Sequence, residues 1–376
     1  MALHRAARYS FAELVVGLHG ELATGNIKRT QQCELSLYTY TTKCVMERAW
    51  SDFSRVARGL ILDETDEHIV ALPFEKFFNY GEFEAVPNEP FTAYEKLDGS
   101  LGIVYEYKGE WQVATKGSFD SEQAIWATEW LRNHIDLSKL EPELTYLTEI
   151  IYPDNRIVVD YRGLEALAFL SSYHRRDFRE YTEPPEAAGF AAAKVQAYES
   201  VKDLLAAAET LSANHEGFVL RFDSGLRLKI KGDEYARVHR LISEVTPLGV
   251  WRVMLAGDDL AALRGQIPEE YWRDLDSIVS LLEGNLQQFV SELEDALAKT
   301  AGLDDKNLGL LLKEGGGKLN ETQRAFIFAA RKQNLLQALK TPGPLREKVF
   351  KTFRPTGNQL TGYRSSSAVN RFGEAS

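Results

Sequence analysis

The residues best suited to chemistry form the segment Tyr94-Glu95-Lys96-Leu97-Asp98-Gly99-Ser100, where a lysine stands beside an acid and a glycine. A lysine amine can attack the α-phosphate of ATP and hold AMP as a phosphoramidate, provided that it is unprotonated when it attacks. Free lysine is almost wholly protonated at neutral pH, so this chemistry predicts nearby cations that depress the pKa of Lys96. Gly99 would let the backbone approach a nucleotide, and Asp98 would orient a substrate hydroxyl or its metal. Taken alone, the segment is equally well explained as a surface turn before a strand.

A second candidate group lies in residues 227–231, where basic and apolar residues alternate. On a strand, Arg227, Lys229 and Lys231 would share one face. Two lysines there would offset the charge that builds on an α-phosphate during attack, although a half-buried strand with a solvated cationic side is the plainer alternative. Glu216 begins the preceding β-type run, where its carboxylate could hold Mg²⁺.

Short β-type runs are expected to position these residues. They recur between about Thr30 and Lys231 with turn-forming residues between many of them, which predicts antiparallel sheets. The runs are LSLYTY, GLILD, LGIVYEY, WQVATK, LTYLTEII, RIVVDY, ALAFLSSY, GFVLRF and LRLKIK. Helical periodicity interrupts them in residues 121–134 and 192–211, so this part of the chain is expected to be α+β.

The character of the sequence changes after Lys231. Residues 271–297 and 321–339 show amphipathic helical patterns, and no strand run of comparable strength accompanies them. We therefore expect two domains, an α+β domain over residues 1–242 and an all-α domain over residues 243–376. The polar end from about Thr356 is expected to be mobile.

Composition limits the class of protein. The net charge of −11 argues against a chain that coats nucleic acid through a basic surface, but it is compatible with a local cationic site. Cys33 and Cys44 lack metal-binding spacing, and no apolar stretch is long enough for a membrane span. A folded cytoplasmic enzyme without a membrane partner, in a bacterium or a phage-infected host cell, is the expectation.

Four motifs in a fixed order resemble the covalent nucleotidyltransferases, which include ATP-dependent ligases and mRNA capping enzymes. They are Lys96-Leu97-Asp98-Gly99, Glu149, Glu216-Gly217-Phe218-Val219 and Lys229-Ile230-Lys231. Four longer stretches are similar to the bacteriophage T-even RNA ligase 1 family in particular. They are Arg58-Gly59-Leu60-Ile61, residues 73–79 (PFEKFFN), Lys116-Gly117-Ser118 followed by residues 121–124 (SEQA), and residues 153–158 (PDNRIV).

The resemblance implies a nucleotidyltransferase domain of antiparallel sheets flanked by helices, with a role for each matching residue. Lys96 would be the adenylylated nucleophile, and Lys229 and Lys231 would contact the α-phosphate. Glu216 would bind metal, while Glu149 would contact the nucleoside or a second metal-bound water. Asp98 and Gly99 would belong to the same nucleotide site.

Further nucleotide contacts follow from the resemblance alone. Four residues would hold the β and γ phosphates and orient pyrophosphate for departure: Tyr38, Arg58, Lys76 and Lys116. Adenine would lie between Val219 and a residue of the 167–170 strand, Phe169 or Leu170. Tyr235 matches a family tyrosine whose role is less defined.

The implied activity is ATP-dependent RNA ligation. A 5′-phosphate and a 3′-hydroxyl RNA end would be joined through lysyl-AMP and an adenylylated RNA 5′ end, with Mg²⁺ or Mn²⁺ as metal. The RNA could be a cleaved tRNA, and a separate kinase/phosphatase would heal the ends, since no P-loop motif occurs in the sequence. The helical C-terminal part, where DNA ligases and capping enzymes usually carry an OB barrel, favours RNA over those two alternatives. A non-catalytic RNA-binding relative is the remaining alternative.

Overall fold

The computed structural model of the chain describes residues 3–332 and 335–365. The chain divides into two compact units, residues 1–239 and residues 240–374. The division falls within helix α6 (Asp233–Ser243), a few residues before the expected boundary at 242/243. Each unit is described by itself.

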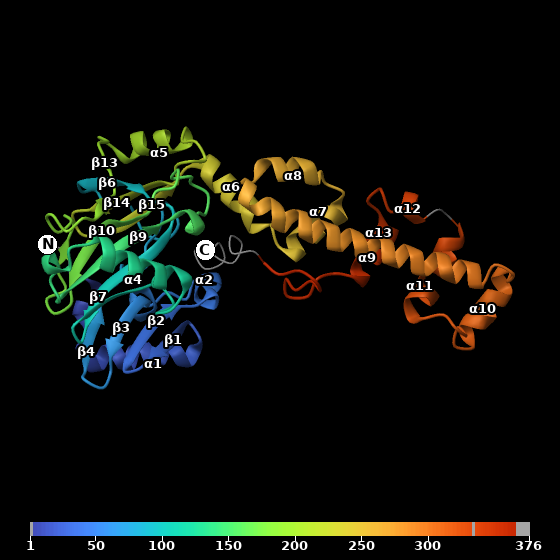
Figure 1. The fold of residues 1–376 in the computed structure, drawn as a ribbon, viewed down its shortest axis with the longest axis horizontal. Coiled ribbons are helices and arrows are strands. Elements are labelled where there is room, and N and C mark those ends of the chain that lie inside the picture. Colours follow the sequence, from blue (N-terminus) through green and yellow to red (C-terminus); the bar gives the residue numbers. More distant parts are fainter. Residues whose placement is uncertain (1–2, 333–334, 366–376) are drawn as a thin grey trace. The chain divides into compact units, whose positions relative to one another are not determined.

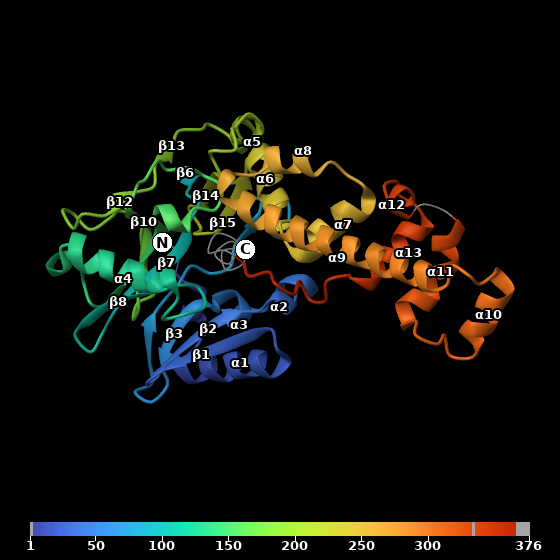
Figure 2. The ribbon, with the colours of Figure 1, turned by 45° about the vertical axis from the view of Figure 1, so that its right-hand side comes forward.

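The first sheet of unit 1 has four antiparallel strands in the order β1 (Ile27–Gln32), β2 (Leu35–Tyr40), β3 (Arg58–Asp63) and β4 (His68–Ala71). Helix α1 (Phe11–Thr24) lies along this sheet in both views (Figures 1 and 2). Its N-terminus carries a capping box in which Ser10 and Glu13 satisfy each other's backbone N–H groups. The short elements η1 (Arg5–Arg8), α2 (Thr42–Glu47) and α3 (Asp52–Val56) complete this region.

The second sheet has the strand order β11 (Glu180–Tyr181), β10 (Ala166–His174), β9 (Leu144–Ile151), β7 (Ser100–Tyr107) and β8 (Glu110–Ala114). β12 (Ala191–Ala192) pairs with β10 in parallel, whereas the other pairs are antiparallel. Helix α4 (Glu122–His134) covers one face by burying Ala127 and Leu131 against the sheet. The turns η2 (Leu137–Lys139) and η3 (Pro153–Asn155) flank β9.

The third sheet carries the candidate chemistry. Its strand order is β13 (Val195–Gln196), β6 (Phe91–Lys96), β14 (Gly217–Phe222), β15 (Arg227–Lys231) and β5 (Phe78–Asn79), with only the β15–β5 pair parallel. Helix α5 (Val201–Glu209) packs on the face that holds Phe218, Leu220, Leu228 and Ile230. Because side chains alternate along a strand, Lys96, Lys229 and Lys231 emerge on the opposite face.

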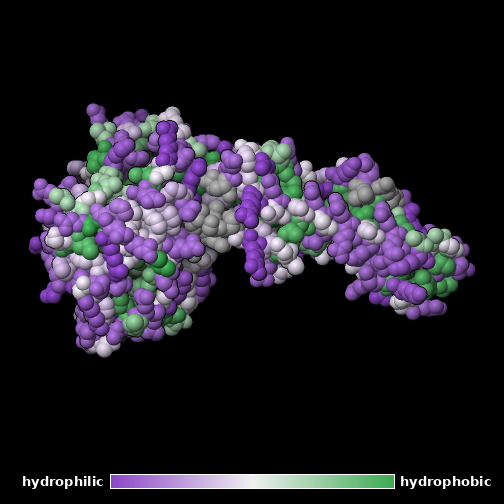
Figure 3. Space-filling view, viewed as in Figure 1, coloured by the Kyte–Doolittle hydropathy of each residue, from purple (hydrophilic) through white to green (hydrophobic). Residues whose placement is uncertain are grey.

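Unit 2 is helical apart from an isolated bridge between Thr356 and Gln359, over the residues that the structure describes. After α6 come α7 (Pro247–Ala256), α8 (Leu260–Gln266), η4 (Glu269–Tyr271), α9 (Trp272–Lys299), α10 (Asp305–Lys313), α11 (Glu321–Lys332), α12 (Leu335–Ala338) and α13 (Pro344–Thr352). Among the described residues, no helix is apolar over enough of its length to cross a membrane. On the face of unit 1 drawn in Figure 3, apolar surface is interspersed with hydrophilic side chains.

The chain after α13 is less free than the sequence suggests. The Tyr363 hydroxyl donates to Asp274 of α9 at 2.7 Å, and the backbone N–H of Leu248 in α7 donates to Asn358. Residues 356–365 therefore make specific contacts, although a mobile end is expected from about Thr356. The rest of that expected end, residues 366–376, lies outside the described residues.

Three local expectations differ from the structure. The run RIVVDY (156–161) is not a strand, because a buried carboxylate, Asp98, binds the backbone N–H groups of Val158 and Val159. Within residues 192–211 only Val201–Glu209 is helical, since Val195–Gln196 forms an edge strand beside β6. The sequence pattern does not predict strand β6. Lys96 is the last residue of β6 and also precedes β7.

Candidate active site

Strand register brings Lys96 and the 227–231 strand together. Gly217 of β14 lies opposite both Lys96 of β6 and Lys231 of β15. Two residues further along, Val219 lies opposite both Tyr94 and Lys229. Directly opposed residues of antiparallel strands point to the same face, so the lysines of two distant motifs share one surface.

Glu216 bridges two of these lysines. Its Oε2 lies 2.7 Å from Lys96 Nζ and its Oε1 lies 3.2 Å from Lys231 Nζ, while its side chain is only 4% exposed. Burial alone would raise the pKa of Glu216, but the two ammonium groups hold it below the usual range. Gly217 has φ +137°, and a Cβ there would stand 2.0 Å from the Ile230 carbonyl oxygen. Gly217 is thus needed for β14 to start beside β15.

Lys96 is not activated in the way its surroundings were expected to activate it. Burial acts to lower the pKa of Lys96, but the carboxylates of Glu216, Glu149 and Asp98 outweigh it and raise that pKa. On the same sheet face, burial and repulsion from Lys76 and other cations lower the pKa of Lys229, to about 7. Without nucleotide, Lys96 is therefore an ammonium group held by acids.

Asp98 and Tyr235 form an internal clamp, which corrects their expected role as nucleotide contacts. Asp98 Oδ2 accepts the backbone N–H groups of Val158 and Val159, both at 2.9 Å, and Oδ1 accepts the Tyr235 hydroxyl at 2.7 Å. The Asp98 carboxylate is 3% exposed and Tyr235 is 1% exposed. These bonds occupy the carboxylate and fix the turn after Lys96, so both residues position the lysine from within the protein.

Gly99 is also required by packing. A Cβ at this position would stand 2.5 Å from the Ile150 carbonyl oxygen and 3.2 Å from Glu149 Cγ. The glycine therefore lets β9 approach the turn after Lys96, a different reason from the expected approach of backbone to nucleotide.

Glu149 lies beside this turn on β9, opposite Leu101 of β7 and Ala168 of β10. Burial raises the pKa of its carboxyl group to about 7, and the neighbouring acids Glu216 and Asp98 add to this, whereas Lys96 opposes it. Glu149 is thus close enough to influence Lys96 and is partly protonated at neutral pH.

Arg58 and Lys76 lie near Lys229, and Lys116 lies near Arg58 and Lys76; we call Arg58, Lys76, Lys116 and Lys229 the cationic cluster. Together with burial, repulsion among these cations lowers the pKa values of the three lysines. Burial and Arg58 lower the pKa of Lys116 to about 8, and burial is the largest cause of the lowered pKa of Lys76. Among the described residues, no carboxylate forms an ion pair with any member of the cluster, and Arg58 Nη1 is buried without a hydrogen-bond partner. Such a group of unneutralised charges favours a polyanion.

Tyr38 does not belong to this cluster, contrary to the sequence-based expectation. It lies opposite Arg29, and its hydroxyl donates to Glu64 and lies beside His19. The tyrosine near the cluster is Tyr40, whose ring centre lies 5.8 Å from Lys76 Nζ and 5.4 Å from Lys116 Nζ. Tyr38 and Tyr40 are alternate residues of β2, and their different contacts in the fold separate them.

The residues expected to contact adenine lie on different faces of their sheets. Phe169 is 2% exposed and packs with Phe190 in the core beneath α4, so it is excluded as a base contact. Leu170 is the unpaired residue of a bulge in β10 and packs on the cluster that contains Leu147, on the face that also carries Glu149. Val219 faces the lysines.

A divalent cation fits these residues only in part. Among the described residues, no group of three or more histidine, cysteine or acidic side chains is arranged to hold a metal ion. Asp98 is 3% exposed and already accepts three hydrogen bonds, which leaves Glu216 and Glu149 as the carboxylates best placed to bind metal. One or two carboxylates suffice for Mg²⁺ when phosphate oxygens and waters complete its shell.

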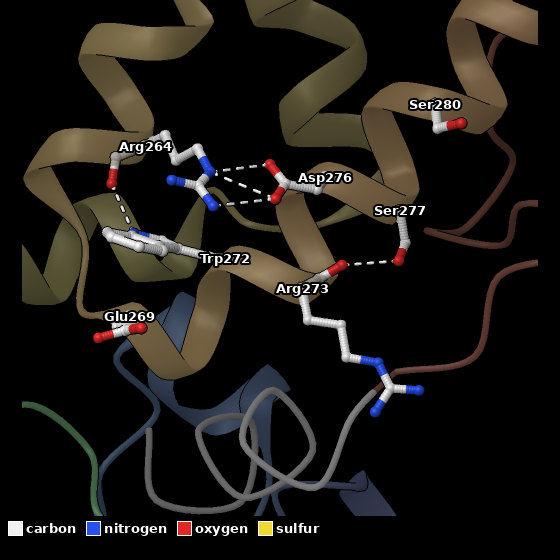
Figure 4. Close-up of a pocket in the computed structure, with 7 residues that line it drawn as sticks. All are labelled: Arg264, Glu269, Trp272, Arg273, Asp276, Ser277 and Ser280. Atoms are coloured by element: carbon white, nitrogen blue, oxygen red, sulfur yellow. Dashed lines mark hydrogen bonds and ion pairs between the residues drawn. The ribbon is translucent and has the colours of Figure 1, made fainter.

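Unit 2 has a shallow hollow at the start of α9 that is chemically different. Figure 4 shows Arg264 lying over the Trp272 ring, with the guanidinium 3.9 Å from the ring centre, and paired with Asp276 at 3.0 Å. Trp272 Nε1 donates to the Arg264 carbonyl oxygen at 2.8 Å. Arg264 and Asp276 therefore neutralise each other in this hollow, in contrast to the lysines on the sheet face of unit 1.

The chain is similar to proteins that are described as RNA ligases. A candidate bifunctional polynucleotide kinase/RNA ligase of Autographa californica nuclear polyhedrosis virus is 27% identical over 285 residues, 64% of this chain and 41% of that protein. The RNA ligase of Rhodothermus phage RM378 is 26% identical over 173 residues, 34% of this chain and 39% of that protein. The chain thus spans about two fifths of the length of both relatives.

An archaeal ATP-dependent RNA ligase of known structure superposes with a TM-score of 0.47 at 17% identity, covering 70% of this chain and 75% of that one. The family model described as RNA ligase matches residues 56–235, which include Arg58, Lys96, Lys229 and Tyr235. Over residues 56–235, this chain is similar to the RNA ligase family.

Proposed function

We propose that the protein is an ATP-dependent RNA ligase that forms lysyl-AMP on Lys96. The observation that carries the proposal is the placement of one lysine, Lys96, against Glu216 and Lys231 on the same sheet face as Lys229. The names of the relatives, which are RNA ligases, support RNA as the substrate.

In the first step, Lys96 Nζ bonds to the α-phosphorus of ATP while the bond to the β-phosphate oxygen breaks and pyrophosphate leaves. The Lys96 ammonium group must lose a proton before it attacks. Glu216 is the adjacent proton acceptor, because its Oε2 lies 2.7 Å from Lys96 Nζ. Lys229 and Lys231 would offset charge on the α-phosphate. Bound Mg²⁺ or Mn²⁺, held by Glu216 and Glu149, would neutralise phosphate charge.

In the second step, a 5′-phosphate oxygen of RNA attacks the same phosphorus, and the bond to Lys96 breaks. In the third, a 3′-hydroxyl attacks the RNA 5′-phosphorus, AMP leaves and the strand is sealed. Tyr40, Arg58, Lys76 and Lys116 would hold the β and γ phosphates in the first step. Val219 and Leu170 are left as the adenine contacts, since Phe169 is excluded by its burial.

The cellular setting is a further part of the proposal. Repair of a broken structured RNA such as tRNA, in the cytoplasm, agrees with a cationic site confined to one region of an acidic chain. A kinase and phosphatase that prepare the ends would act as a separate protein, and one relative is described as joining kinase and ligase in one chain.

Intact mass after incubation with ATP and Mg²⁺ tests the first step. The natural chain should gain one AMP, Lys96→Ala should gain none, and Lys194→Ala, which removes an exposed lysine beside β13, should gain AMP normally. Labelling by GTP in place of ATP would indicate a capping-type enzyme. Transfer of the adduct to 5′-phosphorylated DNA in place of RNA would indicate a DNA ligase, and failure to form any adduct would support a non-catalytic relative.

A further inference from the structure

A row of three side chains crosses the first sheet beside the cationic cluster. Lys28 of β1 lies opposite Thr39 of β2, and Thr39 lies opposite Arg58 of β3. Since directly opposed residues of antiparallel strands share a face, the three side chains form one line that extends outward from Arg58. Neither Lys28 nor Thr39 is expected from any motif in the sequence.

The face of this row looks onto the backbone that carries Lys116. Thr30, two residues after Lys28, donates from its hydroxyl to the Gly117 carbonyl oxygen at 3.3 Å. A Cβ on Gly117 would lie 3.7 Å from Thr39 Cγ2 and 3.9 Å from Lys28 Nζ. Lys28 is also near enough to help lower the pKa of Lys116. Lys28 Nζ therefore lies at the Lys116 end of the cationic cluster.

The row also contains two buried polar groups without a partner. Thr39 is 1% exposed, and its Oγ1 has no hydrogen-bond partner. Arg58 Nη1 is also buried without a hydrogen-bond partner. No carboxylate among the described residues pairs with Lys28, whereas the adjacent Arg29, on the other face, lies 3.6 Å from Glu64. Buried donors left unsatisfied cost free energy, which a ligand with several acceptor oxygens would recover.

We propose that Lys28 and Thr39 form a further phosphate subsite, which takes the terminal phosphate of ATP and the distal phosphate of the departing pyrophosphate. The inference rests on the proposed function for the identity of the ligand. The row lies beyond Arg58, whereas Lys96, Lys229 and Lys231 lie on the third sheet, so it would contact the part of the triphosphate furthest from the reacting atom. It would discriminate triphosphate from AMP and leave the later steps, from which pyrophosphate is absent, unchanged.

Calorimetric titration of the full chain with pyrophosphate, and separately with AMP, tests the subsite without requiring activity. Lys28→Met and Thr39→Val should each weaken pyrophosphate binding by roughly five- to tenfold, as expected for a charge-assisted hydrogen bond, and AMP binding by less than about twofold. Arg29→Met is the matched control on the same strand and should change neither. Thermal melting checks folding, which the exposed Lys28 and the isosteric valine should preserve.

A third titration, with RNA that carries or lacks a 5′-phosphate, separates the two possible sources of phosphate. Pyrophosphate affinities unchanged in both variants, or a selective loss of binding to the 5′-phosphorylated RNA, would overturn the subsite. The result is independent of the ligase proposal. If the variants bind pyrophosphate more weakly but the natural chain forms no AMP adduct, the subsite is retained and the ligase proposal is rejected. If the natural chain forms the adduct but the variants bind pyrophosphate normally, the ligase proposal is retained and the subsite is rejected.

Discussion

The two ends of one sheet face hold buried carboxylates with the same arrangement and different partners. At one end Glu216 bridges Lys96 and Lys231, and at the other Glu180 bridges Arg221 and Arg227. Both carboxylate side chains are almost fully buried, 4% and 3% exposed. A lysine can lose its proton and change partner, whereas a guanidinium is always charged and binds a carboxylate through a planar fork. The lysine end can therefore exchange protons and partners, whereas the ion pairs of the arginine end serve to hold the structure.

Neighbouring contacts at the arginine end agree with this division. The Arg227 guanidinium lies 4.6 Å from the centre of the Phe74 ring, and the Ser171 hydroxyl donates to Glu180 at 2.7 Å. A cavity of about 250 Å³ adjoins this pair, but Arg5 and Arg55 at its rim are themselves ion-paired, with Glu75 and Glu84. Lys76 of the cationic cluster also lines this cavity, which therefore adjoins both the arginine end and the cluster.

Replacing Glu216 should have the largest effect. In Glu216→Gln the carboxylate that raises the pKa of Lys96 is lost, so more of the lysine becomes free amine. We still expect adduct formation to slow by about 10²-fold or more, because the variant removes the acceptor for the Lys96 proton and a ligand for the metal. Single-turnover formation of the AMP adduct between pH 6 and 9 measures this. Faster adduct formation at neutral pH would show that Glu216 only restrains the lysine.

Glu180→Gln is the structural counterpart. It leaves the buried Arg227 without its anion, and the free energy of unfolding should fall by about 3 kcal/mol, as for other broken buried pairs. The rate of adduct formation per folded molecule should change by less than about twofold. Urea denaturation and the same single-turnover assay measure the two quantities. A stability loss in Glu216→Gln as large as that in Glu180→Gln would remove the distinction between the two ends.

The lysine end should also respond to pH. The pKa of Lys229 is about 7 and that of Lys116 about 8 in the absence of nucleotide, and a bound polyphosphate raises both. The complex then holds more protons than the free protein, so pyrophosphate binding should weaken as pH rises through 7 to 8. Calorimetry at pH 8 in buffers of different ionisation enthalpy should detect uptake of roughly one proton.

Lys229→Met supplies the control for that measurement. Lys229, with a pKa of about 7, is about nine-tenths deprotonated at pH 8, whereas Lys116, with a pKa of about 8, is about half deprotonated. Proton uptake at pH 8 should therefore fall by about two thirds while Lys116 still contributes. Uptake unchanged in this variant would place the titrating group elsewhere.

What the sequence could predict differs between these two regions. The alternation of residues 227–231 predicts a shared face for Lys229 and Lys231, and the order of motifs identifies Lys96 and Glu216. Their contact depends on the pairing of β6, β14 and β15, which only strand register establishes. Periodicity also predicts α4 and α9, since long amphipathic patterns depend little on context.

The failures have a common physical cause, which is that tertiary partners override local pattern. RIVVDY has the composition of a strand, but Asp98 takes the N–H groups that a sheet would need. Tyr38 and Tyr40 are indistinguishable by type and, as alternate residues of β2, by strand pattern, so only their partners in the fold separate them. The ionisation of Lys96 depends on three acids from separate segments, and no local motif reports their combined charge.

The smallest expected effect comes from exchanging the two kinds of cation. Lys231→Arg keeps the charge beside Glu216 but replaces a compact ammonium with a wider fork, which holds Glu216 more firmly and competes with Lys96 and the metal for its oxygens. Adduct formation should slow by roughly fivefold, with little change in melting temperature. Arg227→Lys should do the opposite, lowering stability by about 1 kcal/mol through the loss of fork geometry and leaving adduct formation unchanged. If both substitutions changed only the rate of adduct formation, or only the stability, the type of cation would not explain the difference between the two ends of the sheet face.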